Sequence, residues 1–314
     1  MSSISVIIPA YNVEGYVEQA IQSVLSQTIL PDEIIIINDG STDNTAHVLE
    51  KYVNNSLFKI FHTLNKGLGE ARNRGLKESC SEYVYFFDSD DLLNSSFIEK
   101  IKLNIERYSN PDLIFFSGQS FHDKKYKGNS SFFPTYDRGF NDYFKDSYSL
   151  ISALMNQNSF YSSACLYVSR KELWTSRDLK FKSIVHEDEE VIFQLAAHSQ
   201  SSVVIEDMLF CRRIRNDSIM TSSKTIKNLN GILVSLESMY EFKKKHPILY
   251  KELKPLWKKR VFTLTVSIIY LIYQLRKPTI KLIVIKALYD SYSKETAVKT
   301  IKTIKTKLFN ARQR

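Results

Sequence analysis

The chain has 314 residues, enough for one catalytic domain and an appendage, and its 43% hydrophobic and 25% charged residues are typical of a folded rather than a disordered protein. The three cysteines lie far apart, which excludes zinc-ligand or redox spacing and favours a reducing compartment. Charge is uneven: residues 1–240 carry a net charge of −6 and residues 241–314 a net charge of +15. An acidic body with a basic tail indicates two different tasks.

No export or membrane-spanning segment is expected. The N-terminus lacks the basic start and long apolar run of a signal peptide. The most apolar stretch, 261–275, contains polar residues and is shorter than the ~20 residues that span a bilayer. We therefore expect a cytoplasmic protein.

Strand and helix signals alternate through the first ~120 residues, counted from the printed sequence. Apolar runs predict strands at 4–8, 33–37, 58–61, 83–87 and 113–116, and helical spacing predicts helices at 13–27, 42–52 and 68–77. A capping-box spacing from Ser96 to Glu99 predicts the start of a further helix. Repeated strand–helix–strand units predict an α/β fold whose mostly parallel, doubly wound sheet has helices on both faces.

The later residues give a mixed pattern. Residues 120–145 predict a loop or short antiparallel strands, followed by a strand at 164–169, a helix at 186–198 and a strand at 203–213. From Thr225 onward the pattern is helical and basic. We expect a catalytic domain at 1–223 and a basic helical region at 224–314.

Polar segments follow three of the predicted strands: Pro9–Asn12, Asn38–Ser41 and Asp88–Asp91. Ligands of doubly wound sheets bind beyond the carboxyl ends of the strands, so one crevice is expected to collect all three segments. Asp88, Asp90 and Asp91 place three carboxylates within four residues, an arrangement that a hard cation such as Mg²⁺ or Mn²⁺ stabilises. The alternative is a polar turn that caps the following helix.

Other segments carry weaker signals. Asp39 follows a buried strand and could accept a hydrogen bond from a base or ribose, whereas the residues after Gly40 also suit simple helix capping. The loop 65–73 enters a helix and could meet a nucleotide, or it is merely a loose helix start. Acids at 187–190 could include a general base, or they only complement a helix dipole. Arginines at 212, 213 and 215 match phosphate oxygens, or they form a solvated surface or pair with those acids.

Taken together and in order, these segments resemble the family-2 glycosyltransferases, an inverting group with the GT-A fold. The resemblance covers about residues 3–223, including Val6–Asn12, Asn38–Asp43, the 65–73 loop, Asp88–Asp91, the Glu187–Asp188 pair and the Ser218–Thr221 segment. One departure is Asn38, where the family often has Asp.

The resemblance implies a role for each matching residue. Donor-binding residues would be the following: Pro9, Tyr11, Asp39, Arg72, Asp88, Arg213 and Arg215. Asp90 and Asp91 would hold Mn²⁺ or Mg²⁺, and Asp188 would be the catalytic base. The implied reaction moves a hexose or N-acetylhexosamine from a UDP-sugar to a glycan or lipid-linked acceptor, with inversion, in capsule, O-antigen or other cell-surface polysaccharide synthesis.

The tail supports a location. Apolar residues such as Ile280, Ile283 and Leu288 alternate with lysines at helical spacing, which favours peripheral contact of 241–314 with the anionic inner face of the cell membrane. A solvated helical bundle and a tail that forms a homo-oligomer are the alternatives. The region lacks the aromatic stacking platforms of nucleic-acid-binding proteins.

Two other functions are considered. A non-catalytic nucleotide-sugar-binding scaffold for another transferase would be expected to lose the Asp88–Asp91 carboxylates or Asp188, and this chain keeps both. A nucleotidyltransferase would need a glycine-rich phosphate loop after the first strand, where Pro9–Asn12 stands instead.

Overall fold

The computed structural model describes residues 2–129, 131–216, 218 and 221–275. The chain divides into two units, residues 1–183 with 195–222 and residues 184–194 with 223–314. Segment 184–194 therefore groups with the residues that follow Ser222. The predicted domain division at 223/224 stays a prediction.

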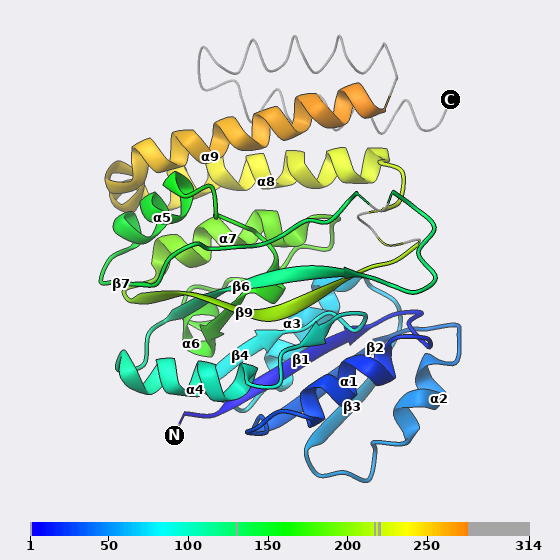
Figure 1. Cartoon of the computed structure of the whole chain (residues 1–314). Coiled ribbons are helices and arrows are strands. Elements are labelled where there is room, and N and C mark those ends of the chain that lie inside the picture. Colours follow the sequence, from blue (N-terminus) through cyan, green and yellow to red (C-terminus); the bar gives the residue numbers. More distant parts are fainter. Residues whose placement is uncertain (1, 130, 217, 219–220, 276–314) are drawn as a thin grey trace. The chain divides into compact units, whose positions relative to one another are not determined.

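The described part of the first unit is a nine-stranded sheet with helices (Figure 1). Its strands are β1 (Ile4–Ala10), β2 (Glu33–Asp39), β3 (Phe58–Thr63), β4 (Tyr83–Phe86), β5 (Leu92–Leu93), β6 (Leu113–His122), β7 (Asp142–Phe144), β8 (Tyr167–Arg170) and β9 (Ser202–Ile214). Its helices are α1 (Val17–Leu25), α2 (Thr45–Glu50), α3 (Leu68–Glu78), α4 (Phe97–Arg107), α5 (Ser147–Asn156), a 3-10 turn (Ala164–Leu166) and α6 (Lys171–Thr175). Helix α7 (Glu187–His198) begins in the second unit and ends in the first.

Strand order explains where a ligand would bind. The sheet runs β3-β2-β1-β4-β8-β6-β9-β5, with β7 also paired to β9. The first four strands are parallel, and β1 lies between β2 and β4, which is the point where the winding direction reverses. Such a switch point opens a crevice at the carboxyl ends of the strands. The predicted α/β fold with a mostly parallel sheet is confirmed.

The parallel order is interrupted by β8. This strand is antiparallel to both neighbours, with Tyr83 opposite Arg170 and Leu113 opposite Ser169. Strands β6 and β9 then run parallel to each other, and β7 is a short antiparallel strand on β9. The apolar pattern at 164–169 predicts a strand but not which strands it pairs with. The position of β8 between β4 and β6 could therefore not be predicted.

Side chains of β1 alternate between the two faces of the sheet. Val6 and Ile8 belong to the buried cluster that includes Ile21 of α1 and Phe97 of α4. Ile7 points the other way, toward α3, where a Cβ on Gly75 would overlap its Cγ2 atom. Helices on both faces explain why β1 and β2 read as continuous apolar runs.

Two helix starts and one helix cap differ from expectation. Helix α1 begins at Val17 instead of Val13, and α2 at Thr45 instead of Thr42, because the skipped residues bond the two loops to each other (below). The capping box at Ser96 is wrong: its hydroxyl donates to Asn94, and Glu99 accepts from Thr28 instead. Helix α4 nevertheless begins at Phe97.

The described second unit is helical. Helix α8 (Ile226–Lys245) is capped by Thr225, whose side chain forms a capping box with Asn228, and α9 (Pro247–Gln274) packs along it. The Trp257 indole N–H donates to the Met239 carbonyl oxygen at 2.7 Å, which fixes α9 against α8. Among the described residues no helix is long and apolar enough to cross a bilayer.

Candidate functional site

The loops that follow β1 and β2 are bonded to each other. The Asn12 side chain accepts from the Thr42 N–H at 2.8 Å, and the Asn12 N–H donates to the Ser41 hydroxyl at 3.1 Å. The Val13 N–H donates to the Thr45 hydroxyl at 2.9 Å. Asn12 has a positive φ of 50°, which Asn tolerates better than most residues. These bonds fix the two loops against each other at the carboxyl ends of β1 and β2.

Asp39 organises the next loop. It is 4% exposed, and its two oxygens accept from the Lys66 N–H at 2.9 Å and the Gly67 N–H at 2.8 Å. Gly40 has φ +69°, and a Cβ there would lie 2.7 Å from the Asn65 nitrogen. The aspartate and glycine therefore shape the 65–73 loop. Asp39 also lines a cleft of about 360 Å³ with that loop.

Pro9 and Tyr11, at the end of β1, differ in their exposure to solvent. Pro9 is buried within β1, opposite Ile37 of β2. Tyr11, just past the end of the strand, is 49% exposed. An exposed ring beside fixed backbone is available to stack on a flat ligand.

Arg72, from α3, reaches the turn Asp88–Asp91 that follows β4, called the acidic turn below. It is 2% exposed, and its guanidinium donates to Asp88 at 2.8 Å while lying 5.2 Å from the ring of Phe181. A buried cation needs a charged partner, so this pair fixes Asp88 at the carboxyl end of β4. The sequence predicted Arg72 near the donor, and the structure brings it to the predicted metal-binding turn.

Two arginines of β9 and its following loop reach the same turn from the other side. Arg213 is 7% exposed and donates to the Asp90 carbonyl oxygen at 2.8 Å, the Gln19 side chain at 2.8 Å and Asp123 at 3.2 Å. Arg215 donates to the Asp90 carboxylate at 2.7 Å. Arg213 is thus a cross-link within the site, whereas Arg215 neutralises one of its carboxylates.

The three aspartates have different surroundings. Asp91 is 4% exposed and accepts from the Arg213 N–H at 2.7 Å. Burial, and then the charges of Asp90 and Asp88, raise the pKa of Asp91 well above its usual range. The side chains of Asp88 and Asp90 are 32% and 21% exposed, and each bonds an arginine through one oxygen.

This geometry decides how a metal would fit. Within the described ranges no group of three acidic, histidine or cysteine side chains forms a ready-made metal cluster. Mg²⁺ commonly takes only one or two protein carboxylates and completes its shell with substrate phosphates and water. The partly exposed Asp88 and Asp90 fit that arrangement. Asp91 already holds β9 through its bond to Arg213, so its assignment as a ligand stays a prediction.

A further cleft lies beside this turn. It has a volume of about 680 Å³ and is lined by the β1–α1 loop, the 121–125 segment and Arg213. Tyr16 contributes its ring, 5.3 Å from the guanidinium of Arg213 and 5.0 Å from that of Arg215. The sequence analysis missed Tyr16, Gln19 and Asp123, because nothing in a helix start or a Lys-rich loop marks them as partners of an arginine 90 or more positions away.

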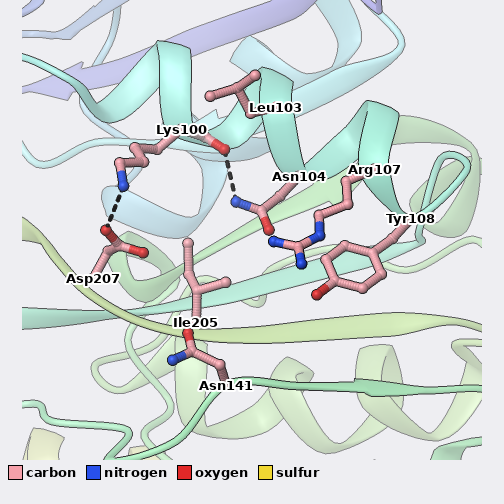
Figure 2. Close-up of a pocket in the computed structure, with 8 residues that line it drawn as sticks. All are labelled: Lys100, Leu103, Asn104, Arg107, Tyr108, Asn141, Ile205 and Asp207. Atoms are coloured by element: carbon pink, nitrogen blue, oxygen red, sulfur yellow. Dashed lines mark hydrogen bonds and ion pairs between the residues drawn. The ribbon is translucent and has the colours of Figure 1, made fainter.

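Another cleft, of about 410 Å³, lies between α4 and the first half of β9 (Figure 2). Lys100 and Asp207 form an ion pair of 3.0 Å across it. None of its lining residues was predicted to be functional. Its aspartate resembles Asp90 in exposure and pairing, and so provides a matched control for the experiments below.

Asp188 belongs to the second unit, near the start of α7. Its carboxylate accepts from the Glu189 N–H at 2.9 Å. His186 precedes the helix with a φ of 67°, and burial lowers the pKa of its imidazole although Asp188 and Glu189 act in the opposite direction. The role of Asp188 as catalytic base stays a prediction.

The neighbours of Asp188 have structural partners from α8 and α9. Arg260 forms an ion pair with Glu189, and the Ser238 hydroxyl donates to Glu190. A Cβ on Gly231 would overlap the Val185 carbonyl oxygen, so α8 touches the backbone directly before the acids. For Glu189, a cationic partner is therefore supplied by α9, in the basic region for which the sequence predicted membrane contact.

Comparison with known proteins identifies the family to which the chain belongs. The sequence matches the model of Glycosyl transferase family 2 over residues 5–173. The chain belongs to this family. That match contains the loops after β1 and β2, the 65–73 loop and the acidic turn, and it stops before α7.

Relatives and solved structures agree with this membership. The uncharacterized glycosyltransferase EpsJ of Bacillus subtilis is 36% identical over 105 residues, and the match covers 33% of this chain and 30% of EpsJ. A cholesterol galactosyltransferase of Borreliella burgdorferi is 28% identical over 264 residues, covering 82% of this chain and 71% of that protein. The structure of S. aureus TarS 1–349 in complex with UDP-GlcNAc has a TM-score of 0.63 at 18% identity, covering 98% of this chain and 92% of TarS 1–349, which shows a shared fold.

Proposed function

We propose that this family-2 glycosyltransferase is an inverting, metal-dependent hexosyl- or N-acetylhexosaminyltransferase. Its donor is a UDP-sugar, and its acceptor is a hydroxyl of a glycan or lipid-linked oligosaccharide in the synthesis of capsule, O-antigen or another cell-surface polysaccharide. The observation that carries the proposal is the pair Asp88 and Asp90, partly exposed at the switch point of the sheet and each held by an arginine.

In the proposed reaction the acceptor oxygen forms a bond to the anomeric carbon as the bond from that carbon to the diphosphate breaks. Asp188 accepts the proton that the acceptor hydroxyl loses. Arg215 bonds to Asp90 of the turn where the leaving diphosphate is proposed to gain charge, and its planar guanidinium matches phosphate oxygens. A single displacement of this kind inverts the anomeric configuration.

Asp88 and Asp90 are the residues proposed to hold Mg²⁺ or Mn²⁺. When bound, such an ion supplies positive charge to the diphosphate and makes it a better leaving group. Arg72 and Arg215 keep both carboxylates in place before the donor arrives. Tyr11 and Asp39 are proposed to contact the base and ribose.

Two of the compared proteins support the substrate classes. TarS, which shares the fold, was solved with UDP-GlcNAc, in agreement with a UDP-sugar donor. The Borreliella relative is named for transfer to cholesterol, a lipid, in agreement with an acceptor held at a membrane. Cytoplasmic placement at the inner face of the membrane follows from this proposal.

The test is binding and hydrolysis of a panel of UDP-, GDP- and dTDP-sugars, each with Mn²⁺ or with EDTA. We expect slow hydrolysis of one UDP-sugar with Mn²⁺ only, loss of that hydrolysis in Asp90→Asn, and no change in Asp207→Asn, whose carboxylate is similarly exposed and paired. The scaffold alternative predicts binding of a nucleotide sugar without turnover under every metal condition. No binding of any nucleotide sugar would refute both.

A further inference from the structure

The exposed face of α9 has two chemically different halves. Four lysines, at positions 251, 254, 258 and 259, are exposed along its first half. Large apolar side chains are exposed along the second half: Phe262 (61%), Val266 (47%), Ile269 (50%), Tyr270 (58%) and Tyr273 (69%). Their spacing of four, three, one and three residues places them on one side of the helix. These five residues are called the α9 stripe below.

The stripe cannot turn inward. The opposite side of α9 is already buried, through Leu264, Ile268, Leu271 and Ile272. Arg260 adds a buried ion pair with Glu189, which fixes the rotation of the helix about its axis. A soluble surface rarely exposes so many contiguous large apolar groups, and such a patch marks a docking surface.

Charge selects the kind of partner. Within α9 the sequence has one acidic residue, Glu252, against five basic ones. A second copy of this chain docked on the same face would bring these lysines into an interface where α9 offers a single acid, Glu252, to neutralise them. Residues 276–314 carry eleven basic and two acidic residues, so this segment has the same sign as the lysines. An anionic surface that is apolar underneath complements both halves at once.

We infer that the α9 stripe and its lysines dock on an anionic lipid bilayer. The lysines contact lipid headgroups, while the stripe enters the boundary between headgroups and acyl chains, where tyrosines are favoured. This surface lies in the second unit and does not depend on the donor site. It would place the transferase at the membrane that holds a lipid-linked acceptor.

The experiment is co-sedimentation of the full chain with phosphatidylcholine vesicles, with and without phosphatidylglycerol, at low and high salt. We expect binding only to vesicles with phosphatidylglycerol, weakened by salt. Ile269→Glu with Tyr273→Glu should lower the affinity about tenfold or more, because burial of one such side chain is worth a factor of that order. Lys258→Glu with Lys259→Glu should lower the affinity and its salt dependence.

The matched control is Val53→Glu, the same kind of change at a 56% exposed position of the first unit, which should bind vesicles like the wild type. Melting temperature and UDP binding in solution, measured on the same samples, separate loss of docking from loss of folding and from failure of the donor-site proposal. Three results would overturn the inference: no vesicle binding by the wild type, unchanged binding by the stripe variant, or a dimer in solution that the stripe variant dissociates.

Discussion

The chain contains two acidic clusters, 88–91 and 187–190, with different support. In the first, arginines from α3 and from the end of β9 bond Asp88 and Asp90, and both carboxylates stay partly exposed. In the second, Arg260 of α9 forms an ion pair with Glu189, and the Ser238 hydroxyl of α8 donates to Glu190. The first cluster thus keeps two partly exposed carboxylates beside arginines, whereas the second anchors the start of α7 to its neighbouring helices.

The largest effect is expected at Asp188, the proposed catalytic base. Its neighbours Glu189 and Glu190 are instead bonded by α9 and α8. Asp188→Asn should lower kcat by about 10²–10⁴-fold, because an amide cannot accept the acceptor proton. UDP binding should be retained. Glu190→Gln keeps a hydrogen-bonding partner for Ser238 and should leave kcat within a few fold. Steady-state kinetics on both variants measure this difference. An equal loss of kcat in Asp188→Asn and Glu190→Gln would contradict the role proposed for Asp188.

The support of the second cluster is testable through Gly231. An alanine there would place its Cβ on the Val185 carbonyl oxygen, and backbone cannot move aside as a side chain can. We expect Gly231→Ala to cost about 1–3 kcal/mol of unfolding free energy, as overpacked sites do. Gly15→Ala is the control, since a Cβ at Gly15 meets no atom within 4 Å. Equal urea midpoints for the two variants would mean that α8 does not hold this segment.

Smaller still is the expected effect of Arg215→Lys, which keeps the charge beside Asp90 and removes the planar fork. UDP affinity should fall about tenfold, the value of one lost charge-assisted hydrogen bond. Calorimetric titration of UDP in the presence of Mn²⁺ measures it. Affinity equal to the wild type would remove Arg215 from the diphosphate site.

The smallest effect concerns a carboxylate with a purely structural role, Glu33 at the start of β2. Burial alone would raise its pKa, but Lys59, the Ser5 hydroxyl and the Cys80 N–H together lower it from 4.5 to about 2. A depressed folded-state pKa contributes stability that is present above pH 4.5 and lost as pH falls toward 2. Because the Lys59 side chain is 40% exposed, we expect only about 1 kcal/mol. Glu33→Gln should flatten the decline of unfolding free energy over that range, and an unchanged slope would contradict this assignment.

Sequence reasoning succeeded where local chemistry decides the outcome. The apolar runs of β1, β2 and β4, with helical spacing between them, were sufficient to predict the mostly parallel sheet and its helices. The single crevice expected to collect the polar residues after these strands stays a prediction. Sequence reasoning failed where distant segments decide. The place of β8 between β4 and β6, the bonds that delay α1 and α2, and the pairing of Arg213 with Gln19 and Asp123 all depend on contacts made only after folding. Asp91 shows the limit within one motif, since only the fold reveals that it is buried and bonded to β9.

The acidic turn is the proposed donor site, and one measurement tests this directly: calorimetric titration of UDP into the wild type, Asp90→Asn and Asp207→Asn, each with Mn²⁺ and with EDTA. We predict that Mn²⁺ tightens UDP binding in the wild type and in Asp207→Asn, and that Asp90→Asn loses this metal dependence while its melting temperature is retained. UDP binding that is equally tight with EDTA in all three proteins, or equally sensitive to Mn²⁺ in Asp90→Asn, would contradict the proposal.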